Sequence, residues 1–137
     1  MSTDLTPDLT PGAALPEQVF TVTRADLVAY AEASGDHNPI HQDEEIALGV
    51  GLPGVIAHGM YTLALVGSAV STWTSGAEVV ELGSKFTSPV VVPAVGGAEV
   101  VVNGTVKSVA DGLVTLALEV TCEGRKVLGM PRAVVRA

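Results

Sequence analysis

The chain has 137 residues, 47% of them apolar and without an internal repeat, which fits one compact domain and disfavours two. Seven Lys and Arg against fifteen Asp and Glu give a formal net charge of −8, so a surface for nucleic acid or for an anionic membrane is disfavoured. No segment has the length and unbroken apolar character of a membrane span, and the first residues lack the basic start and apolar run of a secretion signal. We therefore expect a cytoplasmic protein without membrane insertion.

The N-terminal segment, residues 1–16, is rich in Thr, Pro, Asp and Gly and shows no periodicity. We interpret it as an arm that precedes a single domain over residues 17–137. A short β-branched run over residues 19–22 predicts the first strand of that domain. We expect the arm to carry no chemistry.

A helix is predicted over residues 24–33, because Thr23 and Asp26 resemble the two halves of a capping box. The apolar spacing gives this helix a buried stripe of Leu27, Tyr30 and Ala31. A glycine follows and ends the helix. Farther along, residues 43–48 predict a short helix with Ile46 facing inward.

The run from Gly59 to about Ser75 is apolar or small on every side, which predicts a long helix buried all round. Four strand-like runs follow it: residues 79–91, 99–109, 113–122 and 126–136. Asp111 and Gly112 predict a tight hairpin turn between the second and third runs. Cys122, the single cysteine, ends the third run, where it predicts a small buried side chain rather than a disulfide or a catalytic thiol. One long helix against an antiparallel sheet predicts an α+β architecture.

Two stretches, SGDHNPIH at residues 34–41 and IAHGM at residues 56–60, contain the candidate site. Asp36 and His41 are the side chains best suited to moving protons near neutral pH, and the Asn-Pro pair between them forces a turn that can aim both at one point. Gly59 opens the long helix, so its N–H is one of the unpaired donors at a helix N-terminus and can face a developing oxyanion. The sequence thus predicts an acid–base site with a backbone donor.

The first stretch also has simpler interpretations. An alternative interpretation of Asp36 is that it forms an Asx turn, in which its side chain accepts hydrogen bonds from backbone N–H groups. His37 and His41 have the spacing of two metal ligands on a helix, but Pro39 between them excludes a straight helix, and we expect no metal site. A calcium loop is disfavoured because Ile40 offers no side-chain oxygen. We interpret His37 as a loop residue.

Two neighbouring residues are expected to support the site. Asn38 would hold the loop by hydrogen bonds and orient His41. His58 would cap the long helix or pack beneath the site rather than take part in the chemistry.

Both stretches resemble the signature of the MaoC-like (R)-specific enoyl-thioester hydratase/dehydratase family: Gly35, Asp36, Asn38, Pro39 and His41 in the first stretch, and Ala57, His58, Gly59 and Met60 in the second. KFTSPV at residues 85–90 is similar to the family strand that follows the central helix. Within the family, the chain looks most like the catalytic B-type subunit of a type II fatty acid synthase (3R)-hydroxyacyl-ACP dehydratase. The resemblance implies a hot-dog fold, in which a curved antiparallel sheet wraps around the central helix. Periodicity alone does not distinguish this fold.

The resemblance also implies a hydro-lyase of fatty acid metabolism. It would add water in the syn sense across a trans-2-enoyl thioester, or remove it from the (3R)-hydroxyacyl form. Asp36 and His41 would shuttle the protons and the Gly59 N–H would polarise the thioester carbonyl, on a loop supported by Gly35, Asn38 and Pro39. No metal or organic cofactor is expected. The serine that related hydratases carry on the central helix has no definite counterpart, because Gly67 and Ser68 leave the register ambiguous.

The expected partners are an acyl-CoA or acyl-carrier-protein thioester and a second hot-dog subunit, in a homodimer or a heterodimer, because a sheet around one helix leaves its edges open. Two rival functions remain. A hot-dog thioesterase would hydrolyse thioesters that lack a 2,3-double bond, and a non-catalytic acyl-binding partner subunit would be expected to lack Asp36 and His41. A local basic patch for an acidic carrier is expected from nearby cations: Arg125, Lys126 and Arg132 or Arg136.

Overall fold

The computed structural model describes residues 9–136. In chain order its elements are β1 (Ala14–Val22), α1 (Arg24–Ser34), the 3₁₀ turn η1 (Pro39–His41), α2 (Glu44–Gly49), α3 (Gly59–Trp73), β2 (Glu78–Phe86), β3 (Ala98–Ala110), β4 (Leu113–Cys122), β5 (Arg125–Lys126) and β6 (Leu128–Arg136). Residues 1–8 of the expected arm lie outside the described residues.

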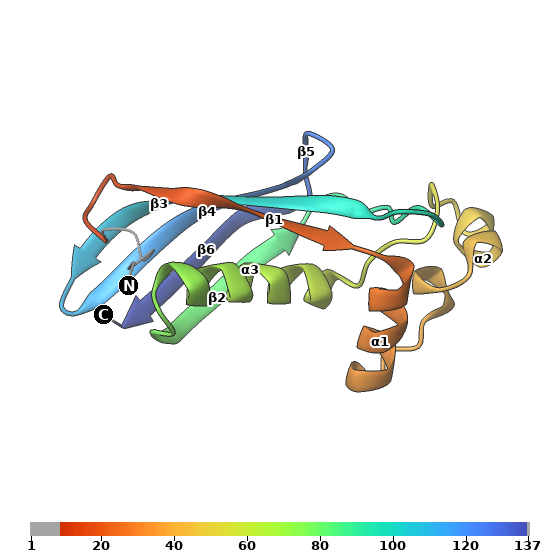
Figure 1. Ribbon diagram of the computed structural model, residues 1–137, viewed down its shortest axis with the longest axis horizontal. Coiled ribbons are helices and arrows are strands. Elements are labelled where there is room, and N and C mark those ends of the chain that lie inside the picture. Colours follow the sequence, from red (N-terminus) through yellow and green to blue (C-terminus); the bar gives the residue numbers. More distant parts are fainter. Residues whose placement is uncertain (1–8, 137) are drawn as a thin grey trace.

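The strands form one antiparallel sheet in the order β1-β3-β4-β6-β2, and β5 pairs with β4. The helix α3 lies along one face of the curved sheet, while α1 and α2 stand beyond the N-terminal end of α3 (Figure 1). This arrangement confirms the predicted α+β architecture with a long central helix. It also leaves β1 and β2 as the two edges of the sheet.

The core forms where α3 meets β3 and β4. The inward side chains of these strands include Val100, Val102, Leu116 and Val120, and all four are buried. Trp73 lies over Gly104 of β3, where an added Cβ would be 3.3 Å from the indole ring. The alternating faces of β3 and β4 therefore bury one apolar side each, as their sequence pattern predicts.

The predicted local signals are present at two places. Thr23 and Asp26 form both hydrogen bonds of the capping box at the start of α1. Asp111 and Gly112 join β3 to β4 with φ angles of 55° and 76°. Two successive positive φ values are typical of the type I′ hairpin turn, which favours Asp-Gly.

Some of the predicted boundaries are wrong. β1 begins at Ala14, within the segment assigned to the arm, because an edge strand accommodates Pro16 through a shift of register between Leu15 and Gln18. The predicted strand over residues 79–91 ends at Phe86, since Pro89 cannot donate a ladder hydrogen bond.

The inward side chain of α2 is also different from the prediction. Ala47 is fully buried, whereas Ile46 is 43% exposed. Asp43 caps the helix by accepting the Ile46 N–H at 3.2 Å, and this start turns Ala47 rather than Ile46 toward the core.

The prediction that the central helix is buried all round is wrong for the single chain. One face of α3 is buried: Thr62, Val66, Ala69, Val70 and Trp73. On another face Met60 is 57% exposed, and the small residues Ala64, Ser68 and Ser71 are exposed as well. The sheet therefore covers only one side of α3. Within residues 9–136, none of the helices has both the length and the apolar character needed to cross a membrane.

Candidate active site

The loop between α1 and η1 is built from consecutive turns. Gly35 ends α1 with φ 81°, a conformation that a glycine adopts without strain. One carboxylate oxygen of Asp36, Oδ1, then accepts the Asn38 N–H at 3.2 Å, and the side chain of Asn38 accepts the Ile40 N–H at 3.2 Å. Pro39 is the first residue of η1. The Asx-turn interpretation of Asp36 is therefore observed, and it occupies only one of the two carboxylate oxygens.

His41 is held in one orientation at the end of this loop. It is 7% exposed, and its Nδ1 lies 2.7 Å from the carbonyl oxygen of Ile56. Because a carbonyl oxygen only accepts, Nδ1 carries the hydrogen, and the neutral ring keeps its lone pair on Nε2. Nε2 is therefore the atom of His41 that can take a proton.

Backbone hydrogen bonds fix the position of this loop relative to the start of α3. The Ile56 N–H donates to the Ile40 carbonyl at 3.2 Å, the Ala57 N–H to Val90 at 2.9 Å, and the Val92 N–H to Val55 at 2.9 Å. Residues 40–41, 55–57 and 90–92 thus form three adjacent segments. His41 and Gly59 are held on a rigid frame, although they are far apart in sequence.

His58 packs against the site, as one of its two predicted roles requires, and it also connects the two halves of the site through contacts that the sequence did not indicate. It is 2% exposed and makes no side-chain hydrogen bond to cap α3. Its Nε2 lies 3.1 Å from the Asp36 carbonyl oxygen, and its ring stacks on His41 with 3.8 Å between centroids and 25° between planes. The only signal in the sequence is its place beside Gly59, because the stack depends on tertiary structure.

The environment of His58 favours its neutral form. Burial lowers the pKa of His58, and the neighbouring His41 lowers it further, against the opposing effects of the Asp36 carbonyl and carboxylate. Its Nδ1 is buried without a hydrogen-bond partner, which also disfavours a proton on that atom. These surroundings thus favour the neutral form of a ring that is stacked against the histidine of the predicted pair.

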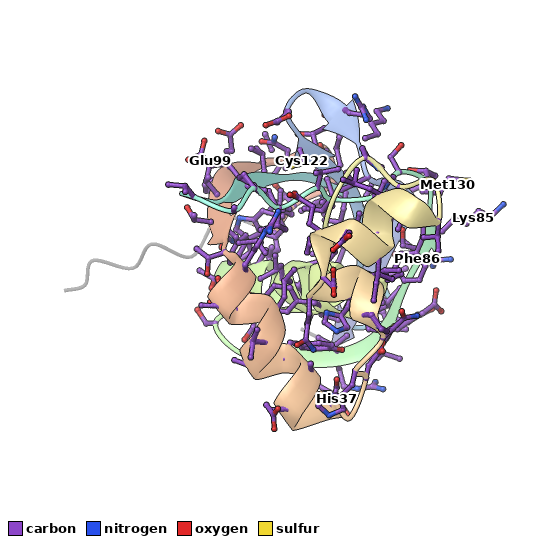
Figure 2. All side chains as sticks on the ribbon, turned by 90° about the vertical axis from the view of Figure 1, so that its right-hand side faces the viewer. His37, Lys85, Phe86, Glu99, Cys122 and Met130 are labelled. Carbon is purple, nitrogen blue, oxygen red and sulfur yellow. The ribbon has the colours of Figure 1, made fainter. Side chains whose placement is uncertain are left out.

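Gly59 begins α3, and among the described residues its N–H has no hydrogen-bond acceptor. A Cβ at this position would lie 3.0 Å from the ring of Phe86, closer than such contacts normally are. In Figure 2 Phe86 lies toward the right of the molecule, and His37 lies at the outer edge of the loop after α1. A glycine is therefore required for the close packing of Phe86 beside the free N–H.

A cavity of about 680 Å³ brings the predicted groups together. Asp36, His41 and Gly59 all line it, with His58, while the rest of its wall is largely apolar: Leu52, Ile56, Ala57, Met60, Phe86, Pro89, Val90, Val127 and Leu128. Gly35, Asn38 and Pro39 do not line it, and they shape the loop instead. Ser68 is exposed on α3 and does not line the cavity, whereas the buried Thr62 does.

Two other kinds of chemistry fit the cavity less well. Asp36, His41 and His58 offer ligand atoms within 4.8 Å of one another. The two imidazole rings are stacked, however, so their nitrogen lone pairs lie in two nearly parallel planes. A metal ion bound to both rings would have to lie in the plane of each, at about 2.0–2.1 Å from each nitrogen, and the stacked arrangement does not favour this. Cys122 is buried outside the cavity wall, and burial raises the pKa of its thiol, the opposite of what a nucleophile requires.

Known proteins resemble this chain in sequence and in structure. 3-Hydroxyacyl-thioester dehydratase X of Mycobacterium tuberculosis is 40% identical over 82 residues, which are 60% of this chain and 29% of that protein. A solved MaoC-like dehydratase is 36% identical with a TM-score of 0.90, covering 96% of this chain and 43% of the other. The chain spans less than half the length of these two proteins. The R-hydratase PhaJ1 from Pseudomonas aeruginosa, solved unliganded, is 28% identical with a TM-score of 0.83, covering 96% of this chain and 84% of the other.

A more distant structure bears on the fold alone. The C-terminally truncated HadBC complex, titled a 3R-hydroxyacyl-ACP dehydratase from Mycobacterium tuberculosis, is 19% identical, covers 95% of this chain and 99% of the other, and has a TM-score of 0.72. Together with the closer structures it confirms the hot-dog arrangement of sheet and central helix. The family model for the MaoC like domain matches residues 9–124. Because that match covers both stretches of the site and most of the sheet, the chain belongs to the MaoC-like family.

Proposed function

We propose that this chain catalyses the reversible addition of water to a trans-2-enoyl thioester, giving the (3R)-3-hydroxyacyl thioester. The observation that carries the proposal is one cavity lined by Asp36, His41 and Gly59, inside walls that are otherwise largely apolar. An apolar wall suits an acyl chain, and a few convergent polar groups suit the reacting end of that chain.

The Gly59 N–H would act on the thioester carbonyl. Water adds to C3 only if the negative charge that develops can move through C2 to the carbonyl oxygen. A backbone donor at the start of a helix stabilises that charge, and it does so best in a site that excludes water. The position of Gly59 at the first residue of α3 supports this assignment.

Asp36 and His41 would move the protons. As the water oxygen bonds to C3, Nε2 of His41 accepts one water proton with help from the free oxygen of Asp36. The pair then returns a proton to C2, so the enzyme ends the cycle unchanged and the reaction needs no electron donor or acceptor. Because the two groups lie within 4.8 Å of each other, they would act on the same side of the double bond.

The names of the relatives support this activity. The matched mycobacterial protein is named a 3-hydroxyacyl-thioester dehydratase, and the Pseudomonas structure is titled an R-hydratase. We extend a hydro-lyase activity of this kind to the present chain, with an acyl group carried on CoA or on an acyl carrier protein. We place the enzyme in fatty acid metabolism in the cytoplasm.

We further propose that the chain works as a dimer, with a second copy or with a different hot-dog subunit. The exposed small residues of α3, next to the open edge of β2, support this proposal, because a partner would cover both. The HadBC structure is itself titled as a complex. Light scattering at micromolar concentration should give the mass of a dimer, and the mass of a single chain would contradict the proposal.

The expected basic patch for an acidic carrier is largely neutralised in the structure. Lys126, Arg132 and Arg136 lie 3.6, 3.2 and 2.9 Å from the carboxylates of Glu119, Glu81 and Glu78. Arg125 has no such partner among the described residues. A more basic partner subunit would therefore suit an acidic carrier better than this surface does.

The test is an assay of crotonyl and longer enoyl thioesters, carried on CoA and on an acyl carrier protein. The loss of the enoyl absorbance measures the rate, and the chirality of the product is determined separately. We expect (3R)-hydroxyacyl product without release of free thiol. Release of thiol from saturated acyl thioesters, with no hydration, would show the thioesterase alternative to be correct.

A further inference from the structure

His58 contacts both members of the proposed catalytic pair. Its Nε2 lies 3.1 Å from the backbone carbonyl of Asp36, and its ring stacks on the ring of His41. With 2% of its surface exposed, it presents very little of itself to the cavity. Any effect of His58 on the reaction must therefore pass mainly through its neighbours.

The hydrogen bond to Asp36 determines the tautomer of His58. The carbonyl oxygen can only accept, so Nε2 carries the hydrogen and Nδ1 is left bare. Nδ1 is buried with no partner, and a second proton there would have no acceptor. The ring is consequently fixed as a neutral donor toward the Asp36 turn.

The ring contacts of His58 fix its orientation. His41 stacks on the ring, and Tyr30 of α1 packs against it at 4.7 Å between centroids with 57° between planes, with Tyr61 of α3 next to Tyr30 at 5.2 Å. A buried ring packed against two other rings has little freedom to tilt. His41 is thus held by two separate contacts, the Ile56 carbonyl in the plane of its ring and His58 on its face.

We propose that His58 is a positioning residue, which holds the Asp36 turn through its Nε2–H and supports the face of His41 through its neutral ring. It thereby keeps the two proton-moving groups at a fixed separation. A charged His58 would repel the imidazolium that His41 becomes on accepting a proton, so the neutral form is the useful one. This inference rests on the proposed hydration reaction.

Three substitutions separate the two contacts. His58→Gln keeps an N–H donor near the position of Nε2 and loses the ring, His58→Phe keeps a ring and loses the donor, and His58→Ala loses both. The matched control is His37→Gln, which changes an exposed histidine on the loop that carries Asp36. For each variant we would measure kcat, KM and Tm with crotonyl-CoA.

We expect kcat of His58→Ala to fall about 100-fold, because a small displacement of catalytic groups has an effect of that order. His58→Gln and His58→Phe should each recover part of the loss, with KM close to that of the wild type in all three. Wild-type kcat in a folded His58→Ala variant would overturn the proposal. So would equal losses in all three variants accompanied by a lower Tm, since that pattern indicates a packing role alone.

A measurement without substrate tests the same contacts. The ¹⁵N NMR signals of the histidine rings in the wild-type chain should show His58 as the neutral Nε2–H tautomer and His41 as the Nδ1–H tautomer. A charged or Nδ1–H His58 at neutral pH would overturn the proposal, whatever the activity. If the wild type and His37→Gln hydrate none of the enoyl thioesters, the proposed function fails, and the NMR result still decides whether His58 holds the Asp36 turn.

Discussion

The two ends of α3 are built differently, although they belong to one helix. At the C-terminal end, the Trp73 indole N–H donates to the Pro16 carbonyl at 2.8 Å, and the Thr74 hydroxyl donates to the Val70 carbonyl at 2.8 Å. At the N-terminal end, the Gly59 N–H has no acceptor among the described residues, and Nδ1 of His58 is buried without a partner. Packing is complete at one end, and polar groups are left unpaired beside a cavity at the other.

This difference indicates what each end contributes. A buried polar group without a partner costs about 1–3 kcal/mol, so a fold keeps such groups only where they have another use. The unpaired groups at the N-terminal end lower the stability of the fold and leave the Gly59 N–H available as a donor to a ligand. The C-terminal end contributes packing. Substitutions at the two ends should therefore have separate effects on activity and on stability.

The largest effect on activity is expected for Asp36→Asn. The amide oxygen of asparagine can still accept the Asn38 N–H, so the turn should remain and Tm should stay close to that of the wild type. Loss of the carboxylate should lower kcat by about 10²–10⁴-fold, the usual contribution of a proton-transfer group. Near-normal turnover by this variant would mean that Asp36 has only the structural role.

His41→Ala should also remove most of the activity, but with a loss of stability. His41 is buried, and the substitution would leave the Ile56 carbonyl without its donor at a cost of about 1–3 kcal/mol. The buried His41 therefore contributes to stability as well as to the proposed chemistry, whereas Asp36 is exposed. Urea unfolding of the two variants side by side should show the difference.

At the other end of α3, Trp73→Ala should act on stability alone. It removes a fully buried indole that packs over Gly104, and comparable substitutions cost about 3–5 kcal/mol. The folded fraction should keep the wild-type kcat at a temperature well below its lowered Tm. A large fall in kcat under those conditions would contradict the separation of the two ends.

Two glycines on the same helix sharpen the comparison further. In Gly59→Ala the new methyl group meets the Phe86 ring at 3.0 Å, so the ring or the backbone donor must shift, and kcat should fall by roughly 10- to 100-fold. In Gly67→Ala the nearest atom, Leu82 Cδ2, is at an ordinary 3.6 Å. That variant should gain about 0.5–1 kcal/mol of stability and keep its activity. Equal kcat values for the two variants would argue against an oxyanion role for Gly59.

The elements that sequence reasoning predicted correctly depend on local chemistry. The capping box at Thr23, the turn at Asp111-Gly112 and the Asn-Pro turn before His41 are each specified by residues within a few positions of one another. The grouping of Asp36, His41 and Gly59 in one cavity was also expected, because the family resemblance joined the two stretches.

The features that the sequence did not predict depend on tertiary structure. The stack of His58 on His41 forms only because residues 55–57 pair with both the motif loop and residues 90–92. The exposed face of α3 has the same small and apolar residues as its buried face, so the pattern does not reveal which face the sheet covers. The start of β1 was not predicted because a proline such as Pro16 is unfavourable inside most strands. It is tolerated here because β1 is an edge strand.

The smallest effect expected is on the pH dependence of stability. The pKa of His58 is lowered below its ordinary value of 6.5, chiefly by burial and then by His41, while Tyr30 and the Asp36 turn contact it from the other elements. Below about pH 6.5 the unfolded chain protonates this histidine and the folded chain does not until its own lower pKa is reached. The unfolded state then binds more protons, so the free energy of unfolding falls as the pH falls through that window, while above it His58 contributes no pH dependence. His58→Gln should make this decline shallower in urea unfolding, and His37→Gln should follow the wild type more closely. An unchanged slope in His58→Gln would show that the neutral, buried state of His58 does not contribute to acid sensitivity.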